Sequence, residues 1–214
     1  MKRPTLDSPK LTEHLPEANF QMIYEEDPPS LFHGHLTDCT ISDVEIERPD
    51  FSKMWFKNVL FQNVSFENVE LTDVVFENCD LSNVNFSGGI IHRVKFIGSK
   101  MLGIDLTEAT LGNVQFDHCI LDFGMFGYSR FKKCVFEHCS MLSSDFVECE
   151  FKQVWLTSCK LDGTNFSGTS LAKLDFSDSE FGSLMLASDD LKGLTVSKEQ
   201  AIGFAQLLGL KIKE

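Results

Sequence analysis

The chain has 214 residues, 43% of them apolar, and carries 32 acidic against 19 basic side chains, for a formal net charge of −13. This length suits one domain or one extended repeat array, and the acidity argues against direct binding to nucleic acid or to an anionic membrane. The N-terminus lacks the apolar core of a signal peptide and no stretch approaches about 18 uninterrupted apolar residues, so we expect a cytoplasmic protein outside the membrane.

Residues 1–30 do not fit the repeat that follows them. A repeat array has a raw end that must be covered, because an unpaired sheet edge invites aggregation. We therefore expect this segment to be an N-terminal cap or a loose arm.

From Leu31 to Val196 a large apolar residue stands at every fifth position without a break. A period of five makes no apolar face on an α-helix and places successive repeats on opposite faces of a plain strand. The pattern therefore requires short extended pieces separated by corners. Two residues after the apolar positions stand turn formers such as Asn58, Asp73 and Gly88, which tolerate the backbone angles of corners.

The sequence also echoes itself at multiples of twenty. FDHC at 116–119 returns as FEHC at 136–139, and NFSGG at 85–89 returns as NFSGT at 165–169. Twenty residues are four pentads, so we predict an all-β solenoid with four sides to each coil and like residues stacked in columns.

The stretch FENCDLSNVNF at 76–86 shows the A(D/N)LXX pattern of the pentapeptide-repeat family, which the chain resembles over about residues 31–196. The resemblance implies a right-handed quadrilateral parallel β-helix of about eight and a half coils. The family includes a quinolone-resistance branch whose members commonly carry loops that project from the rod. The unbroken register here leaves no room for such loops, so the chain is similar to a loopless form.

The C-terminal segment 197–214 predicts a helix from about Lys198 to Leu208, begun by a capping box of Ser197 and Gln200. Its apolar residues cover more of the helix than one contact needs, so one side is expected to close the last coil and another to meet a second copy. In several members of the family a C-terminal helix builds a dimer, which also suggests a homodimer here. The residues expected in that contact are Ile202, Phe204, Leu207 and Leu208.

The side chains that could bind a metal or take part in catalysis all fall on repeat positions. Cys119, Cys139 and Cys159 should stack, either as a disulfide or metal ladder or as small buried hydrophobes, and the last interpretation is favoured. His118 and His138 should share a corner beside Asp117 and Glu137, but a tight metal site wants three or four converging ligands. The sequence holds neither a phosphate loop nor a nucleophile elbow. We predict a non-catalytic protein with no metal and no cofactor.

Two surface features suggest a partner. The register predicts an acidic face, which consists of Glu45, Glu47, Glu67, Asp105, Glu108, Asp145 and Glu148. Phe123, Met125 and Tyr128 should point outward, beside Gly124, which should leave local slack. These three side chains form either an exposed partner patch or part of a bent coil that folds them down.

The resemblance implies a function, because the best-known members of the family are described as DNA mimics that occupy the DNA-binding saddle of type II topoisomerases. Some of them protect gyrase from quinolones. The charge density of this rod is lower than that of DNA, with roughly one net charge per 4 Å of rod against one per about 1.7 Å of duplex DNA. The leading hypothesis is an acidic rod that docks DNA gyrase or topoisomerase IV and confers quinolone tolerance. The alternative is a scaffold for protein interaction with an unknown partner.

Overall fold

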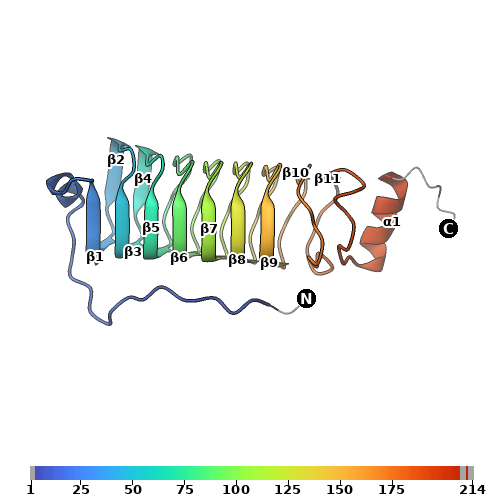
Figure 1. Ribbon diagram of the computed structural model, residues 1–214, viewed down its shortest axis with the longest axis horizontal. Coiled ribbons are helices and arrows are strands. Elements are labelled where there is room, and N and C mark those ends of the chain that lie inside the picture. Colours follow the sequence, from blue (N-terminus) through green and yellow to red (C-terminus); the bar gives the residue numbers. More distant parts are fainter. Residues whose placement is uncertain (1–2, 208–210, 212–214) are drawn as a thin grey trace.

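The computed structural model describes residues 3–207 and 211, and it is a parallel β-solenoid of about eight coils (Figure 1). Seven strands, one from each successive coil, pair in parallel to form the largest sheet. They are β1 (Ser30–Thr37), β3 (Asp50–Lys57), β5 (Glu70–Glu77), β6 (Ile90–Ile97), β7 (Thr110–Asp117), β8 (Arg130–Glu137) and β9 (Glu150–Thr157). Two short pairs lie on other sides, β2 (Thr40–Glu45) with β4 (Leu60–Ser65) and β10 (Thr164–Asn165) with β11 (Leu184–Met185).

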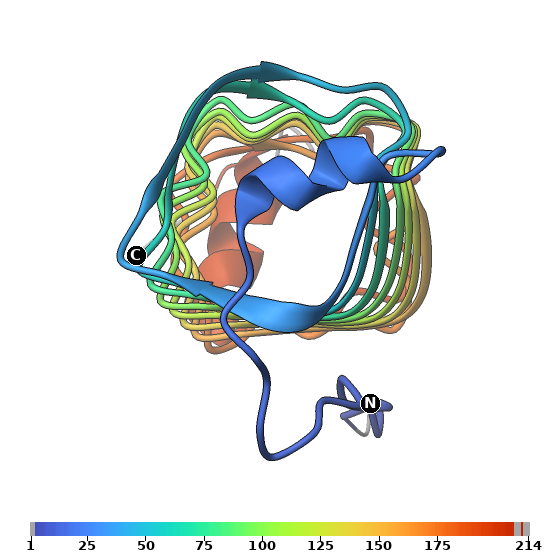
Figure 2. The same cartoon turned by 90° about the vertical axis from the view of Figure 1, so that its left-hand side faces the viewer.

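The register confirms the predicted solenoid. Phe76 pairs with Phe96 and Phe96 with Phe116, so each residue lies beside the one twenty positions later. Viewed from its end, the rod has four sides (Figure 2). Below, a column means a set of residues spaced by twenty on successive coils.

The core is a set of stacked columns, which explains the 20 Phe residues of the chain. One column runs Phe56, Phe76, Phe96, Phe116 and Phe136, with neighbouring ring centroids 4.6 to 5.0 Å apart and ring planes within 8°. The run of stacked rings is flanked in the same column by Leu36 and Leu156, which are also buried. Each aromatic pair adds about 0.5–1.5 kcal/mol beyond the area it buries, so the repeat stabilises itself from coil to coil.

From His33 to Lys173 the corners are formed as predicted, by residues with positive φ two positions after each apolar residue. Asn58 has φ 53° and Asn63 has φ 52°. Their side-chain amides donate to Asp38 and Asp43 of the preceding coil at 2.8 and 3.0 Å, so the corners are also joined along the rod.

The N-terminal end of the core is closed by the 3-10 helix η1 (Phe20–Glu25), which lies across the first coil (Figure 2). Phe20 and Ile23 are buried, and the ring of Phe20 lies 6.2 Å from that of Phe66. Asn19 Oδ1 accepts from Gln21 N at 3.0 Å and so begins this helix.

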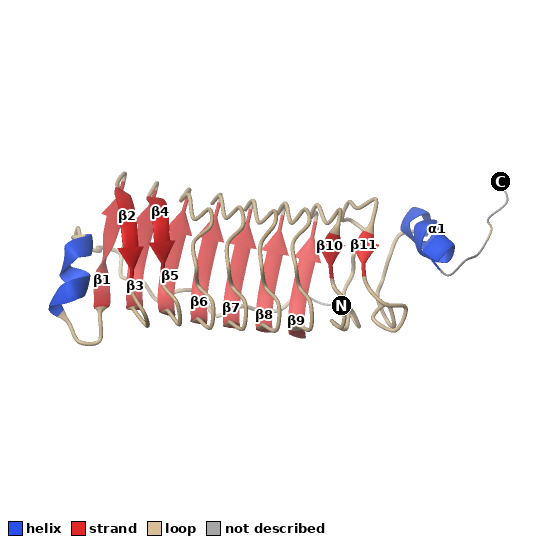
Figure 3. Ribbon diagram, turned by 90° about the horizontal axis from the view of Figure 1, so that it is seen from above, coloured by secondary structure: helices blue, strands red, loops and turns tan. Residues whose placement is uncertain are grey.

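Residues 3–16, the N-terminal arm, run back along the outside of the solenoid, against the direction in which the coils advance (Figures 1 and 3). The backbone N–H of Lys10 donates to Asp73 Oδ1 at 2.9 Å, and that of Asp7 donates to Asn113 Oδ1 at 3.0 Å. Arg3 pairs with Glu137 at 2.7 Å. The arm is therefore fixed to coils far from it in sequence.

The outer surface of the large sheet offers the arm an apolar bed. Leu11 and Leu15 are half-buried and, together with Trp55 and Val75, line a groove between arm and sheet. Contact with this bed covers apolar surface that would otherwise face solvent.

The C-terminal end is covered by helix α1 (Lys198–Leu207). The predicted capping box is present, because Gln200 N donates to Ser197 Oγ at 3.2 Å and Ser197 N donates to Gln200 Oε1 at 2.8 Å. The ring of Phe204 lies 5.7 Å from that of Phe181 in the last coil. Of the residues expected in a dimer contact, the side chain of Leu207 and all of Leu208 lie outside the described part. Within the described residues, no helix has the length and apolar character needed to cross a membrane.

All seven cysteines are free, and six of them are buried. The thiols of Cys119 and Cys139 donate to the backbone carbonyls of Phe96 and Phe116 at 3.3 and 3.5 Å. Cys119 and Cys139 are therefore packed in the core, as their interpretation as small buried hydrophobes requires.

Candidate docking surface

The acidic face lies on a side of the solenoid where most coils are joined by single β-bridges rather than by longer strands. One column on this face links Asn85, Asp105, Met125 and Asp145 through such bridges. The large residues beneath it, including Phe126, are buried and fix the positions of the side chains outside.

Five of the predicted acidic residues are exposed at the surface of this face. They are Glu45, Glu47, Glu67, Glu108 and Glu148. Glu47 lies 3.6 Å from Arg48, an exposed ion pair that contributes little. Within the part of the chain that the structure describes, no Lys or Arg pairs with Glu67, Glu108 or Glu148. These carboxylates are therefore available to a basic partner.

Asp105 and Asp145 have a different role, because each is half-buried and caps a turn. Asp105 Oδ1 accepts from Thr107 N at 2.9 Å, and Asp145 Oδ1 accepts from Val147 N at 3.0 Å. Asn85 makes the same bond to Ser87 N at 2.9 Å, so the turn needs only an oxygen acceptor and not a charge. The two aspartates add charge to the face but also hold its backbone.

Two of the three residues of the predicted partner patch, Met125 and Tyr128, lie within the acidic face, and Phe123 stands at the preceding corner. Met125 stands between Asp105 and Asp145 in one column. The register likewise places Tyr128 between Glu108 and Glu148. Two features that the sequence suggested separately therefore adjoin on one stretch of the rod, which we call the composite surface: the acidic face together with Phe123, Met125 and Tyr128.

The three apolar side chains of the composite surface are exposed, with Phe123 at 61%, Met125 at 44% and Tyr128 at 60% of their full accessible area. The expected slack at Gly124 is absent, which corrects that prediction. A Cβ at Gly124 would lie 2.7 Å from the ring of Phe126 and 2.8 Å from the carbonyl oxygen of Leu121. The core ring fills the space that Gly124 vacates, and the side chains outside are not folded down.

The backbone of the patch is strained as well as exposed. Phe123 has φ 58° and Tyr128 has φ 62°, in the left-handed region that costs an ordinary L-residue roughly 1–2 kcal/mol. Asn63 and Asn68 occupy the matching corners on earlier coils, and asparagine tolerates this conformation better. The conformation itself is common to the corners of the rod, since Lys53 and Lys133 also have positive φ. Phe123 and Tyr128 differ from the other corner residues in presenting large apolar side chains that are exposed and not buried.

The arm leaves the composite surface open. Its ties reach Asp73, Asn113 and Glu137, none of which belongs to the acidic face. Asp73 also pairs with Arg93, its neighbour on the next coil, so the arm is tied to a different side of the rod from the acidic face.

Comparison with known proteins supports the fold. The chain matches the family model described as a pentapeptide repeat region over residues 69–126 and 129–203. It is 41% identical over 213 residues to the uncharacterized protein YisX of Bacillus subtilis (strain 168), covering 99% of this chain and all of that protein.

Among solved structures, QnrB1, described as a plasmid-mediated fluoroquinolone resistance protein, is 18% identical with a TM-score of 0.42, over 84% of this chain and 99% of that one. HetL from Nostoc sp. strain PCC 7120, described as involved in heterocyst differentiation regulation, is 11% identical with a TM-score of 0.38, over 79% of this chain and 90% of that one. The family match and the long alignment with the Bacillus protein, together with the observed coils, show that the chain belongs to the pentapeptide-repeat family.

Proposed function

We propose that the chain is a non-catalytic binding protein whose composite surface docks a basic, DNA-binding protein. The supporting observation is the position of Met125 and Tyr128 between carboxylates on an uncovered side of the rod. Exposed carboxylates would steer a partner rich in Lys and Arg, while desolvated aromatic side chains contribute most of the affinity at such interfaces.

DNA gyrase and topoisomerase IV are the first partners to test, because the best-known members of the family act as DNA mimics on type II topoisomerases. The dilute charge of this rod favours a mixed mode of docking, in which the acidic face provides orientation and the patch provides affinity. A rod bound in the DNA-binding saddle would exclude DNA and would make a host more tolerant of quinolones.

The test is inhibition of gyrase supercoiling by the purified protein, with a triple variant Glu67→Lys, Glu108→Lys and Glu148→Lys. Lysine is suitable at the corner positions 108 and 148, because Lys53 and Lys133 adopt the same positive φ. We expect the variant to lose inhibition at physiological salt. Asp105 and Asp145 are left unchanged because they cap turns.

A matched control carries Glu13→Lys, Glu70→Lys and Glu180→Lys, which are exposed glutamates outside the acidic face. It changes the net charge by the same amount and should retain inhibition. Equal losses of inhibition in the two triple variants would show that the overall charge of the protein, and not the acidic face, causes the effect. Absence of gyrase and topoisomerase IV binding by the wild type at low salt would refute these partners and would favour the scaffold alternative.

We also propose a homodimer through α1. Ile202 is 45% exposed, and Phe181 and Leu184 beneath the helix are only half-buried. A groove of about 500 Å³ lies between α1 and the last coil. Ile202→Asp should give a folded monomer by light scattering, since this side chain is exposed and the change leaves Phe204 in place. A wild-type protein that is already monomeric would refute the dimer.

A further inference from the structure

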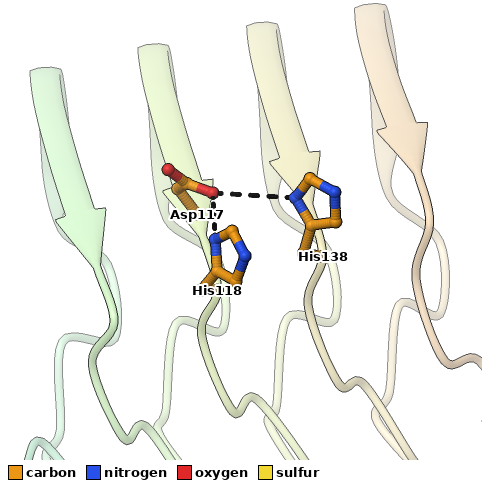
Figure 4. Close-up of side chains that lie close together, drawn as sticks. All are labelled: Asp117, His118 and His138. Carbon is orange, nitrogen blue, oxygen red and sulfur yellow. Dashed lines mark hydrogen bonds and ion pairs between the residues drawn. The ribbon is translucent and has the colours of Figure 1, made fainter.

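Two histidines and an aspartate meet at a corner of the rod outside the composite surface. Asp117 ends β7 and His118 follows it, while Glu137 ends β8 and His138 follows that. Because Asp117 pairs with Glu137 in the sheet, the two imidazoles lie one above the other. Their ring centroids are 4.5 Å apart and their planes differ by 21° (Figure 4).

The distances among these side chains approach those of a metal centre. Asp117 Oδ1 lies 2.7 Å from His118 Nδ1 and 3.9 Å from His138 Nδ1 (Figure 4). One ligand atom from each of the three residues lies within 4.8 Å of the other two. A tetrahedral zinc ion with bonds of about 2.0–2.1 Å would hold its ligand atoms about 3.3 Å apart. Rotation of the two exposed imidazoles supplies this small adjustment, while the paired strands keep the backbone fixed.

The fold itself does not require histidine at these two positions. His118 and His138 have φ 53° and 54°, and their column contains Asn58 and Asn78 at the same kind of corner. Asparagine forms the corner equally well and also bonds to the preceding coil, as Asn58 does. Since the imidazoles are exposed, at 66% and 53% of the side chain, they add nothing to the core either.

We propose that Asp117, His118 and His138 bind one divalent transition-metal ion. Two imidazole nitrogens suit zinc, copper or nickel, whereas calcium and magnesium prefer oxygen ligands alone. Glu137 is not counted as a ligand, because its carboxylate accepts from Arg3 at 2.7 Å and from Gln115 at 3.2 Å. Three protein ligands leave a coordination position to water or to a side chain of a partner. The ligands come from two coils, so the site exists only in the folded rod.

The test is a calorimetric titration of the full chain with zinc. We expect one ion per wild-type chain. The double variant His118→Asn with His138→Asn should bind at least 100-fold more weakly, and it should fold normally because its column already holds asparagines. Zinc should raise the melting temperature of the wild type and leave that of the double variant unchanged. His14→Asn, which removes an exposed imidazole of the arm, is the control and should bind zinc as the wild type does.

Two results would overturn the proposal. One is zinc binding by the double variant within threefold of the wild type, with circular dichroism showing that both are folded. The other is an equal loss of binding in the His14→Asn control. Neither result would affect the proposed docking function, because the composite surface lies on another side of the coil.

Discussion

Replacement of Asp73 should separate the two interactions of its carboxylate and reveal how strongly the arm is held. Asp73 is 3% exposed. It accepts from Arg93 Nε and, at 2.8 Å, from Arg93 Nη2, and it also accepts from Lys10 N at 2.9 Å. We expect Asp73→Asn to lose the ion pair but keep the arm bond, because Asn113 makes the same bond to Asp7 N.

The expected costs follow from these contacts. Hydrogen bonds to a charged group contribute about 1.5–3 kcal/mol, and loss of the Arg93 pair should lie in this range because that guanidinium is partly exposed. Asp73→Ala additionally loses the bond to Lys10, worth about 1 kcal/mol, and places alanine at φ 60°, at a cost of about 1 kcal/mol more. The free energy of unfolding should therefore fall by about 2 kcal/mol for the first variant and about 4 kcal/mol for the second.

The contribution of the ion pair should depend on pH in a defined direction. The hydrogen bonds from Arg93 hold the pKa of Asp73 below its ordinary value. A lowered pKa means that this stability is fully present above the unfolded value of about 3.9 and is lost as the pH falls through the folded value. The gap between the wild type and Asp73→Asn should thus be complete at pH 7 and should narrow below about pH 4.

Two assays check this reasoning. Urea unfolding, followed by the fluorescence of Trp55 and Trp155, measures the gap at several pH values. Trypsin cleavage after Lys10 reports release of the arm and should be faster in Asp73→Ala than in Asp73→Asn. A gap that does not change with pH would refute the role of the Arg93 pair, and equal cleavage rates would refute the arm bond.

Three further predictions concern the core and the C-terminal end. Phe116→Ala leaves a cavity in the core and should lower the free energy of unfolding by about 3–5 kcal/mol. Phe116→Leu loses the stacking on Phe96 and Phe136 and should lower it by about 1–3 kcal/mol. A Leu variant as stable as the wild type would show that stacking adds nothing. Burial raises the pKa of Cys79 to about 11 and that of Cys134 to about 12, so Ellman's reagent at pH 8 should modify them only as the rod unfolds, as followed by mass spectrometry; rapid modification of the native protein would contradict this. Gln200 Nε2 donates to Phe176 O at 2.9 Å and to Ser179 O at 2.8 Å, which ties α1 to the last coils. Gln200→Ala should therefore speed amide hydrogen exchange in α1 about tenfold without affecting exchange in the large sheet. Unchanged exchange in α1 would contradict this tie.

The coils were predictable because a single local rule is repeated throughout them. Each pentad supplies its own corner and its own buried residue, so the register places Phe76 and Phe96 together without knowledge of any distant contact. The capping box of Ser197 and Gln200 was predictable for the same reason. Both are patterns within a few residues.

The course of the arm was not predictable, because it depends on contacts between segments far apart in sequence. Leu11 and Leu15 follow no repeat, and their bed is formed by outward side chains such as Trp55 and Val75. A signal did exist, since apolar residues recur outside the core at 55, 75, 135 and 155. The composite surface was likewise present in the spacing 105, 125, 145 and 108, 128, 148, although the turn-capping role of Asp105 required the structure.

The arm also changes how the rod can come apart. In an ordinary solenoid each coil contacts only its neighbours, so opening can begin at any weak point and spread. Here the N-terminal arm bridges the coils that contain Asp73, Asn113 and Glu137, and disruption of any of these coils strains the ties to the others. The rod should therefore unfold from its C-terminal coils inward, and the coils that the arm ties together should unfold last and as one unit. During synthesis the arm is the first part of the chain to be made. Its last tie cannot form until the coil that contains Glu137 has folded.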